Sequence, residues 1–237
     1  MSWDEDNEIE MLQPVIEQIR SDLGKLPGKR ILVLCSAAGG VVMRLVSEAN
    51  EAYLEKSTMP AQIVGLELDE TLLMSAASWA WNAHLGEVVS FQKAELERIP
   101  LPDESFDALV SEFIVYPTPT PTQIGQREMA RVLKRGGKMI LTDVIVTQPV
   151  AQETRQALQK VGLDYLCEAT QDDFRDWMTD AGLVEVEVLD LTSVVRTVWE
   201  MKWAHDPAPE HREGYEWLLE QGLGKVLFYV YVKGKKV

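Results

Sequence analysis

Residues 30–40 read RILVLCSAAGG, a short apolar run that ends in small side chains. The part from Ile31 to Leu34 has no polar alternation, which is typical of a strand in a parallel sheet that is covered on both faces. The part from Cys35 to Gly40 is small throughout, and small residues let a ligand approach the backbone closely where a helix begins. The stretch therefore predicts a buried strand followed by a tight loop at the start of a helix.

Strand and helix patterns alternate on both sides of this stretch. Residues 12–23 carry apolar side chains at helical spacing and predict an amphipathic helix within an N-terminal part that spans 1–28. The expected strands lie around 31–34, 63–66, 88–91, 106–111 and 138–143, and the expected further helices around 41–54, 70–84 and 123–134. This alternation favours an open, parallel, right-handed α/β sheet over a sandwich or a bundle.

The last hundred residues contain two further strand patterns. Residues 183–189 read LVEVEVL, and the alternation of valine with glutamate is typical of a strand with one wet face at a sheet edge. Residues 226–232 read VLFYVYV and are apolar throughout, so this strand is expected inside the sheet. The segment 192–225 predicts a helical insertion before the last strand. We expect a single domain over residues 1–237.

The charge balance and the composition argue against several classes of protein. The chain has 38 acidic and 23 basic residues, and its formal net charge of −15 repels nucleic acid and anionic membranes unless basic residues are segregated. The basic clusters do not look segregated along the sequence. No apolar run approaches the roughly 18–20 residues of a membrane span, the two cysteines lack metal-ligand spacing, and the start MSWDEDNEIE carries acids but no base. We therefore expect a cytoplasmic protein without a metal site.

Candidate ligand-binding residues follow the first three strands, where an open α/β sheet binds its ligands. Glu67 follows the second strand, and a carboxylate there can accept hydrogen bonds from both hydroxyls of a ribose. Glu95 and Leu96 follow the third strand, where the carboxylate can accept from an adenine amino group and the Leu96 N–H can meet a ring nitrogen. The loop at 35–40 does not read G-x-G-x-x-G, so the dinucleotide signature fails. Together these strand ends favour a ligand with an adenosine but no pyrophosphate.

Four longer pieces of the sequence carry a family resemblance. They are RILVLCSAAGG (30–40), IVGLELDE (63–70), FQKAELERIPLPDESFDALVS (91–111) and EMARVLKRGGKMILTD (128–143). These pieces look like the successive motifs of class I S-adenosylmethionine-dependent methyltransferases, most closely the small-molecule group that includes the ubiquinone and menaquinone C-methyltransferases. The resemblance implies a Rossmann-like fold with a seven-stranded, mostly parallel sheet of order 3-2-1-4-5-7-6 and helices on both faces. It also implies methyl transfer from S-adenosylmethionine to a small-molecule acceptor.

The resemblance further implies a cofactor role for ten residues. Glu67 would hold the ribose hydroxyls, Leu68 would pack on the adenine, and the pair after the third strand would contact the adenine edge. Ser111 and Glu112 would line the methionine end, and the loop after the first strand would approach the cofactor with its backbone. The full set is Cys35, Ser36, Ala37, Gly39, Glu67, Leu68, Glu95, Leu96, Ser111 and Glu112.

The first loop departs from the family pattern D-x-G-x-G-x-G. Val33 stands where the acid would be, and Cys35 and Ala37 stand where two glycines would be. Small substitutes keep such a turn where no positive φ is needed. The departure leaves an alternative function, in which the chain is a catalytically silent protein of the same fold that acts as a binding or partner subunit.

The sequence does not force a general base, because only acceptors that must lose a proton need one. Asp143 is expected directly after the fifth strand, and other acids, a tyrosine and the histidines are alternatives. The candidates are Asp143, Glu112, Tyr116, His84, His205 and His211, and we assign no catalytic residue among them.

Aromatic residues gather in two places. The segment 192–225 contains Trp199, Trp203, Tyr215 and Trp217, which could form the core of a helical pair, cap a substrate or make a homodimer surface. Trp79 and Trp81 lie two positions apart on the helix around 70–84 and point about 200° from each other. One of these two is expected to be exposed or to lie at an interface.

Overall fold

The computed structural model describes residues 13–34, 42, 45–46, 60–112, 123–163, 166–206 and 208–237. Its strands are β1 (Arg30–Leu34), β2 (Gln62–Glu67), β3 (Val89–Lys93), β4 (Phe106–Glu112), β5 (Leu133–Val146), β6 (Cys167–Glu168), β7 (Leu183–Asp190) and β8 (Leu227–Lys236). Its helices are α2 (Gln13–Leu23), α4 (Glu70–Asn82), α5 (Gln123–Val132), α6 (Gln152–Lys160), α7 (Gln171–Asp180), α8 (Thr192–His205) and α9 (Arg212–Trp217). Two single turns, η3 (Pro209–His211) and η4 (Leu218–Gly222), flank α9.

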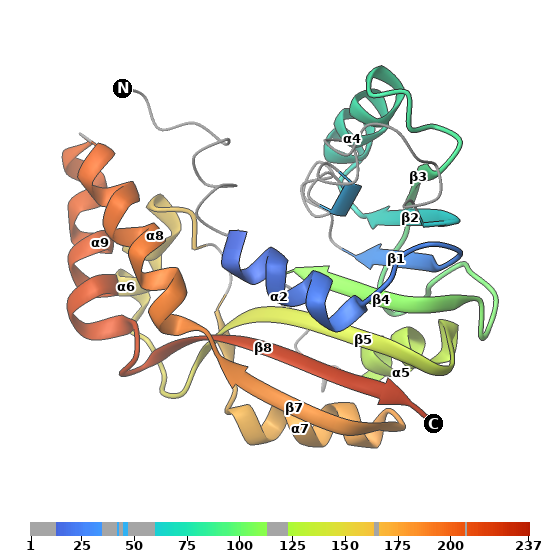
Figure 1. The fold of residues 1–237 in the computed structure, drawn as a ribbon. Helices are drawn as coiled ribbons and strands as arrows, with labels where there is room; N and C mark the ends of the chain where they lie inside the picture. The colour runs from blue at the N-terminus through green and yellow to red at the C-terminus, as the bar shows by residue number, and fades with distance from the viewer. Residues whose placement is uncertain are drawn as a thin grey trace.

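The strands form one mixed sheet in the order β3-β2-β1-β4-β5-β8-β7 (Figure 1). Strands β1 to β5 are parallel, and β8 runs antiparallel between β5 and β7. This is the expected order, with the apolar last strand inside the sheet and the alternating strand at its edge. The expected number of seven strands is one too few, because Cys167–Glu168 forms the short strand β6 beside the end of β5.

Two apolar cores cover the two faces of the sheet. Successive residues of β1 alternate between them, with Ile31 and Val33 facing one core and Leu32 and Leu34 facing the other. The first core contains residues of α2, α4, α6 and α8, and the second contains residues of α5 and α7. Figure 1 shows α2 lying across the first face, with α6, α8 and α9 grouped beyond one end of the strands. The continuous apolar run of β1 is therefore explained by burial on both sides.

The fifth strand is longer than the sequence pattern predicts. The helix expected at 123–134 ends at Val132 as α5, and β5 begins at the next residue and runs to Val146. Its pairing with β8 continues from Lys138 to Val146, so the partner strand extends it past the last residue of the predicted strand. Asp143 consequently lies within β5, and the expectation that it follows the strand is wrong.

Helix α4 has a capping aspartate at its start and an exposed aromatic residue. Asp69 accepts hydrogen bonds from the N–H groups of Thr71 and Leu72, as expected of an N-cap. Trp81 is 78% exposed, whereas Trp79 is half-buried against the first core, so the prediction that one of them is exposed is confirmed. Most of the helix expected at 41–54 lies outside the described residues.

Candidate functional site

The first four strands end side by side at one edge of the sheet, here called the carboxyl edge. Leu34 at the end of β1 pairs with Leu66 of β2 and with Ser111 of β4. Glu67 pairs in turn with Lys93 at the end of β3. The register therefore brings the predicted ribose acid and the predicted methionine-end serine to the two sides of the end of β1.

Glu67 is held in a defined position by the start of α4. Its Oε1 accepts hydrogen bonds from the N–H of Leu68 at 2.8 Å and from the N–H of Asp69 at 3.1 Å. Because these two bonds fix one carboxylate oxygen on the backbone, the second oxygen can serve hydroxyl groups of a ligand at the edge. A half-buried carboxylate oriented in this way fits the ribose of S-adenosylmethionine.

Glu95 and Leu96 lie next to Glu67 through the pairing of β2 with β3. The N–H of Ala94 donates to the backbone oxygen of Glu67 at 3.2 Å, and Glu95 is the next residue along the chain. Its side chain is exposed, whereas the side chain of Leu96 is only 7% exposed and belongs to the second core. This arrangement suits the predicted contacts, in which Glu95 would contribute its carboxylate to a ligand and Leu96 would contribute only its backbone N–H.

Ser111 lies near the end of β4, beside the last residue of β1. It is buried, and its Oγ donates to the backbone oxygen of Leu34 at 3.4 Å, a long bond that a ligand can replace. Glu112 ends β4 opposite Thr142, and its side chain lies outside the described residues. The predicted loop residues Cys35, Ser36, Ala37 and Gly39 and the candidate base Tyr116 also lie outside the described residues.

The remaining candidate bases occupy different surroundings. Asp143 is only 3% exposed, and its Oδ1 accepts the N–H of Val144 at 2.6 Å. His84 is exposed beyond the end of α4 and adopts a φ of 58°. His205 is exposed at the end of α8, where its Nδ1 lies 2.8 Å from the backbone oxygen of Met201. Of these residues, only Asp143 belongs to a sheet strand.

Sequence reasoning missed the partner of His211. Its Nδ1 lies 2.6 Å from Oδ2 of Asp206, and the hydroxyl of Tyr215 donates to the same oxygen at 3.2 Å. Burial would raise the pKa of Asp206, but hydrogen bonds from the Ala208 N–H, His211 and Tyr215 outweigh it and lower the pKa. The spacing of an aspartate and a histidine across two prolines gave no pattern that predicts this contact.

Thr142 is a second residue that the sequence did not single out. It is fully buried in β5, and its Oγ1 has no hydrogen-bond partner within the described part of the chain. It faces Glu112 across the sheet on one side and Tyr231 on the other. A buried hydroxyl beside the end of β4 can donate to a ligand atom at the carboxyl edge.

The aromatic residues of the insertion pack on one another. Tyr215 is 3% exposed, with the ring of Trp203 stacked 6.3 Å from it and the ring of Trp199 at 6.4 Å. They form the core of the helical pair α8 and α9, which is the plainest of the three roles considered for them. Throughout the described ranges, no group of three or more His, Cys, Asp or Glu side chains is arranged to hold a metal ion. No helix among the described residues is both long and apolar enough to cross a bilayer.

Comparison with protein families and curated proteins gives a consistent result. Residues 47–141 match a family model described as a methyltransferase domain. The chain is 25% identical over 205 residues to 27-O-demethylrifamycin SV methyltransferase of Amycolatopsis mediterranei (strain S699), covering 84% of this chain and 68% of that protein. It is also 25% identical to the ubiquinone/menaquinone biosynthesis C-methyltransferase UbiE of Enterobacter sp. (strain 638), covering 70% of this chain and 76% of the relative. Other curated methyltransferases are matched over 54% and 57% of their length, so the chain spans little more than half of them.

Solved structures share the fold. The geranyl diphosphate C-methyltransferase of Streptomyces coelicolor A3(2), in complex with Mg²⁺, geranyl diphosphate and S-adenosyl-L-homocysteine, superposes with a TM-score of 0.73 at 14% identity, covering 95% of this chain and 78% of that one. The strand order, the match over residues 47–141 and the named relatives together make this chain similar to class I S-adenosylmethionine-dependent methyltransferases.

Proposed function

We propose that the chain transfers the methyl group of S-adenosylmethionine to a small organic acceptor bound at the carboxyl edge of β4 and β5. The observation that carries this proposal is the position of Glu67, whose carboxylate is oriented by two backbone N–H groups at the end of β2. Strand β7 runs parallel to β5 and therefore also ends at the carboxyl edge, where α8 begins. The helical insertion is thus anchored on the acceptor side.

The proposed cofactor contacts follow from the strand ends. Glu67 would accept hydrogen bonds from the ribose hydroxyls, Leu68 would pack on the adenine, and Glu95 with the N–H of Leu96 would contact its edge. Ser111 would exchange its long bond to Leu34 for a bond at the methionine end. When bound, S-adenosylmethionine supplies an electrophilic methyl group on a sulfonium. The protein's contribution is then mainly to align the acceptor and to exclude water.

The acceptor is proposed to be neutral or cationic. The net charge of −15 disfavours a free anion near the carboxyl edge, where Glu67, Glu95 and Asp143 add local negative charge. The relatives are named for methylation of a rifamycin derivative and of quinone precursors, which supports a small organic molecule as acceptor. Asp143 is a buried carboxylate near the end of β5. It would take a proton from an acceptor that must lose one.

Binding of S-adenosyl-L-homocysteine tests the cofactor half of the proposal. Calorimetric titration of the wild type should show saturable binding, and Glu67→Ala should weaken it at least about fivefold, because it removes charge-assisted hydrogen bonds worth more than about 1 kcal/mol. Glu220→Gln, which removes one exposed acid in η4, is the matched control and should leave the affinity unchanged. Equal binding by wild type and Glu67→Ala would show that the ribose lies elsewhere.

Turnover separates an enzyme from a silent binding subunit. Wild type that binds the cofactor should release S-adenosylhomocysteine when supplied with a panel of small phenols, quinols and amines. The Glu67→Ala variant should lose this release in proportion to its loss of affinity at limiting cofactor. A protein that binds the cofactor tightly but methylates nothing in the panel would favour the partner-subunit alternative.

We further propose that the protein works in the cytoplasm as a homodimer. Cys167 is a free thiol, which suits a reducing compartment. Met74 and Trp81 lie seven residues apart on α4 and are 68% and 78% exposed, which supplies an apolar face for a second copy. Sedimentation should give a dimer that Trp81→Ser converts to a monomer, and a monomeric wild type would contradict the assembly.

A further inference from the structure

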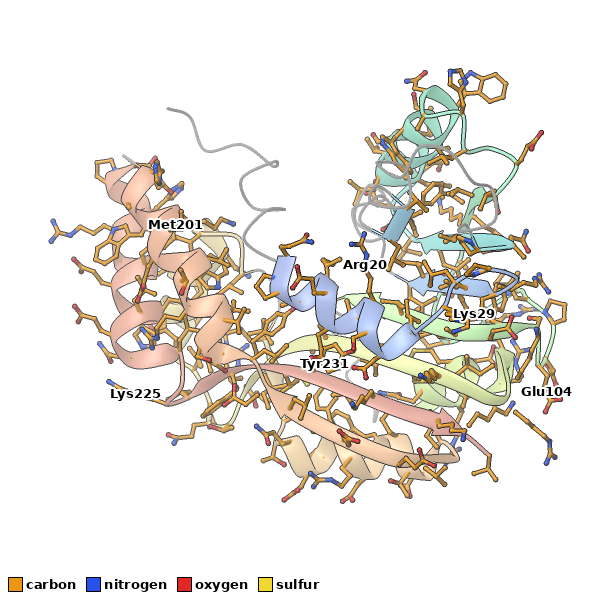
Figure 2. The ribbon with its side chains drawn as sticks, viewed as in Figure 1. Arg20, Lys29, Glu104, Met201, Lys225 and Tyr231 are labelled. Carbon is orange, nitrogen blue, oxygen red and sulfur yellow. The ribbon has the colours of Figure 1, made fainter. Side chains whose placement is uncertain are left out.

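Basic side chains gather at the edge of the sheet opposite the carboxyl edge. Three chain segments that are distant in sequence meet at this edge, a gathering that the sequence alone did not indicate. Lys29, which lies just beyond the end of α2, and Glu104 are labelled on this side in Figure 2. The basic residues in these segments are Lys25, Lys29, Arg30, Lys134, Arg135, Lys138, Lys233, Lys235 and Lys236.

Two lysines of this group meet at the C-terminus of α2. The ammonium of Lys29 donates to the backbone oxygen of Leu23, and the ammonium of Lys138 donates to the backbone oxygen of Asp22. Cations are favourable at a helix C-terminus, so each lysine has a local reason to be here. Each ammonium carries three protons, however, and one hydrogen bond to a carbonyl uses only one of them. Both groups therefore retain capacity for a further acceptor.

Two surface hollows flank Lys138, and their charges differ. The hollow of about 160 Å³ on the side of β7 is balanced in its described lining, with three lysines against Asp22, Glu185 and Glu187. The hollow of about 200 Å³ on the side of β4 is not balanced. Its described lining has a single carboxylate, that of Asp107, against the cations Lys29, Lys134, Arg135 and Lys138.

The single carboxylate of the second hollow is already engaged. Asp107 accepts the N–H of Arg30 at 2.8 Å through Oδ2 and the ammonium of Lys134 at 2.8 Å through Oδ1. Burial would raise the pKa of Asp107, but these contacts and the charge of Lys29 lower it, so the acid stays ionised. Burial and then the neighbouring charge of Lys138 lower the pKa of Lys29, which shows that the cations repel one another across the hollow.

Arg135 adds a cation that can reorient. Its side chain is 79% exposed, and its ion pair with Glu104 is long, at 3.7 Å. Exposed pairs of this kind contribute little to stability, so the guanidinium can turn towards the hollow at low cost. A guanidinium offers two parallel N–H donors to the oxygens of a phosphoryl group, whereas an ammonium acts as a point charge.

We propose that the hollow between the end of α2 and the Lys134–Lys138 turn binds a small anion that carries a phosphoryl group. The anion would accept hydrogen bonds from Lys29 and Lys138, relieve their mutual repulsion and draw in Arg135. This site lies at the opposite end of the strands from the cofactor, so the two ligands would not compete. Either a free phosphate compound or a lipid headgroup offers this chemistry.

Titration with inorganic pyrophosphate at low ionic strength tests the site directly. Wild type should bind one equivalent, and Arg135→Gln should bind at least about tenfold more weakly, which corresponds to one charge-assisted contact. The exposure of Arg135 means that the variant should fold normally. Arg175→Gln on α7 is the matched control, since it removes the same charge from an exposed surface pair, and it should retain wild-type affinity.

Two further arms identify the source of the anion and exclude the cofactor edge. Saturating S-adenosylhomocysteine should leave pyrophosphate affinity unchanged. If the natural ligand is a lipid headgroup, vesicles that contain phosphatidic acid should bind the wild type but not Arg135→Gln, and neutral phosphatidylcholine vesicles should bind neither. If the natural ligand is a free phosphate compound, the wild type should bind soluble pyrophosphate but not the vesicles. The proposal is overturned if neither source binds, if Arg135→Gln matches the wild type, if Arg175→Gln falls equally, or if the cofactor product competes.

Discussion

The hydrogen bond between Asp22 and Tyr231 joins residues near opposite ends of the chain and gives a sharp test of what holds α2 on the sheet. Tyr231 is fully buried in β8, and its hydroxyl donates to Oδ2 of Asp22 at 2.7 Å. Gln18 donates to the same oxygen at 2.9 Å, and Lys233 lies 3.1 Å from Oδ1. Asp22 is therefore a partly buried acid with three donors, and Tyr231→Phe removes one of them without changing the shape of the core.

The expected cost of Tyr231→Phe is about 2 kcal/mol, because the hydrogen bond ends on a charged acceptor and such bonds contribute about 1.5–3 kcal/mol. For a protein of this size that loss lowers the melting temperature by about 4–8 °C. In an Asp22→Asn background the same change breaks only a neutral bond and should cost about 1 kcal/mol or less. The double-mutant cycle, measured by urea unfolding, should therefore give a coupling of about 1 kcal/mol.

The pH dependence of this contact has a definite sign. Burial would raise the pKa of Asp22, but its hydrogen bonds to Gln18, Tyr231 and Lys233 lower the pKa below the ordinary value of 3.8. The stabilisation is therefore fully present above the unfolded pKa and is lost as the pH falls through the folded pKa. Wild type should lose stability more steeply than Asp22→Asn below about pH 4. The reasoning would be refuted if Tyr231→Phe lowered the free energy of unfolding equally in the wild-type and Asp22→Asn backgrounds. It would also be refuted if wild type and Asp22→Asn lost stability in parallel as the pH falls.

Two further predictions concern the helical insertion and the free thiol. In Gly214→Ala the new Cβ would clash with the backbone oxygen of Ala157, so we expect the free energy of unfolding to fall by about 1–3 kcal/mol, although helix propensity alone predicts a gain. Burial, followed by the charge of Asp143, raises the pKa of Cys167 to about 12. Its alkylation at pH 8 in a Cys35→Ala background should be roughly 30-fold slower than that of an ordinary thiol, and a rate matching a free cysteine would contradict the raised pKa of this half-buried thiol.

The full order of the strands was implied by the family resemblance, whereas the places of the last two strands could be predicted from local patterns. The apolar run of β8 and the valine–glutamate alternation of β7 report directly how many faces of each strand are covered. The edge strand also shows why such patterns are incomplete. Glu185 has a φ of 54°, and the register with β8 shifts between Val184 and Glu187, so the alternation is broken by a bulge that no residue type announced.

The length of β5 could not be predicted, because it is set by a partner strand. Residues after Asp143 remain extended since β8 supplies hydrogen bonds as far as Val146, and β6 then pairs with the same end. The consequence for the candidate site is direct. Asp143 was expected directly after the fifth strand but lies within it, where its carboxylate is only 3% exposed.

Net charge misled in a similar way, because it is a sum over the whole chain, whereas a ligand meets a local field. Lys138 and Lys235 are directly paired across β5 and β8, and the end of α2 brings Lys29 to the same place. Along the whole sequence, basic residues are outnumbered by acids. In the described lining of the hollow on the side of β4, however, Lys29, Lys138 and two further cations face a single carboxylate. The fold therefore places Glu67, the proposed ribose acid, at one edge of the sheet and the cations of the proposed phosphoryl site at the opposite edge. An anion that is repelled at long range by the chain as a whole would still be held at short range, where screening by salt leaves only the nearest charges effective.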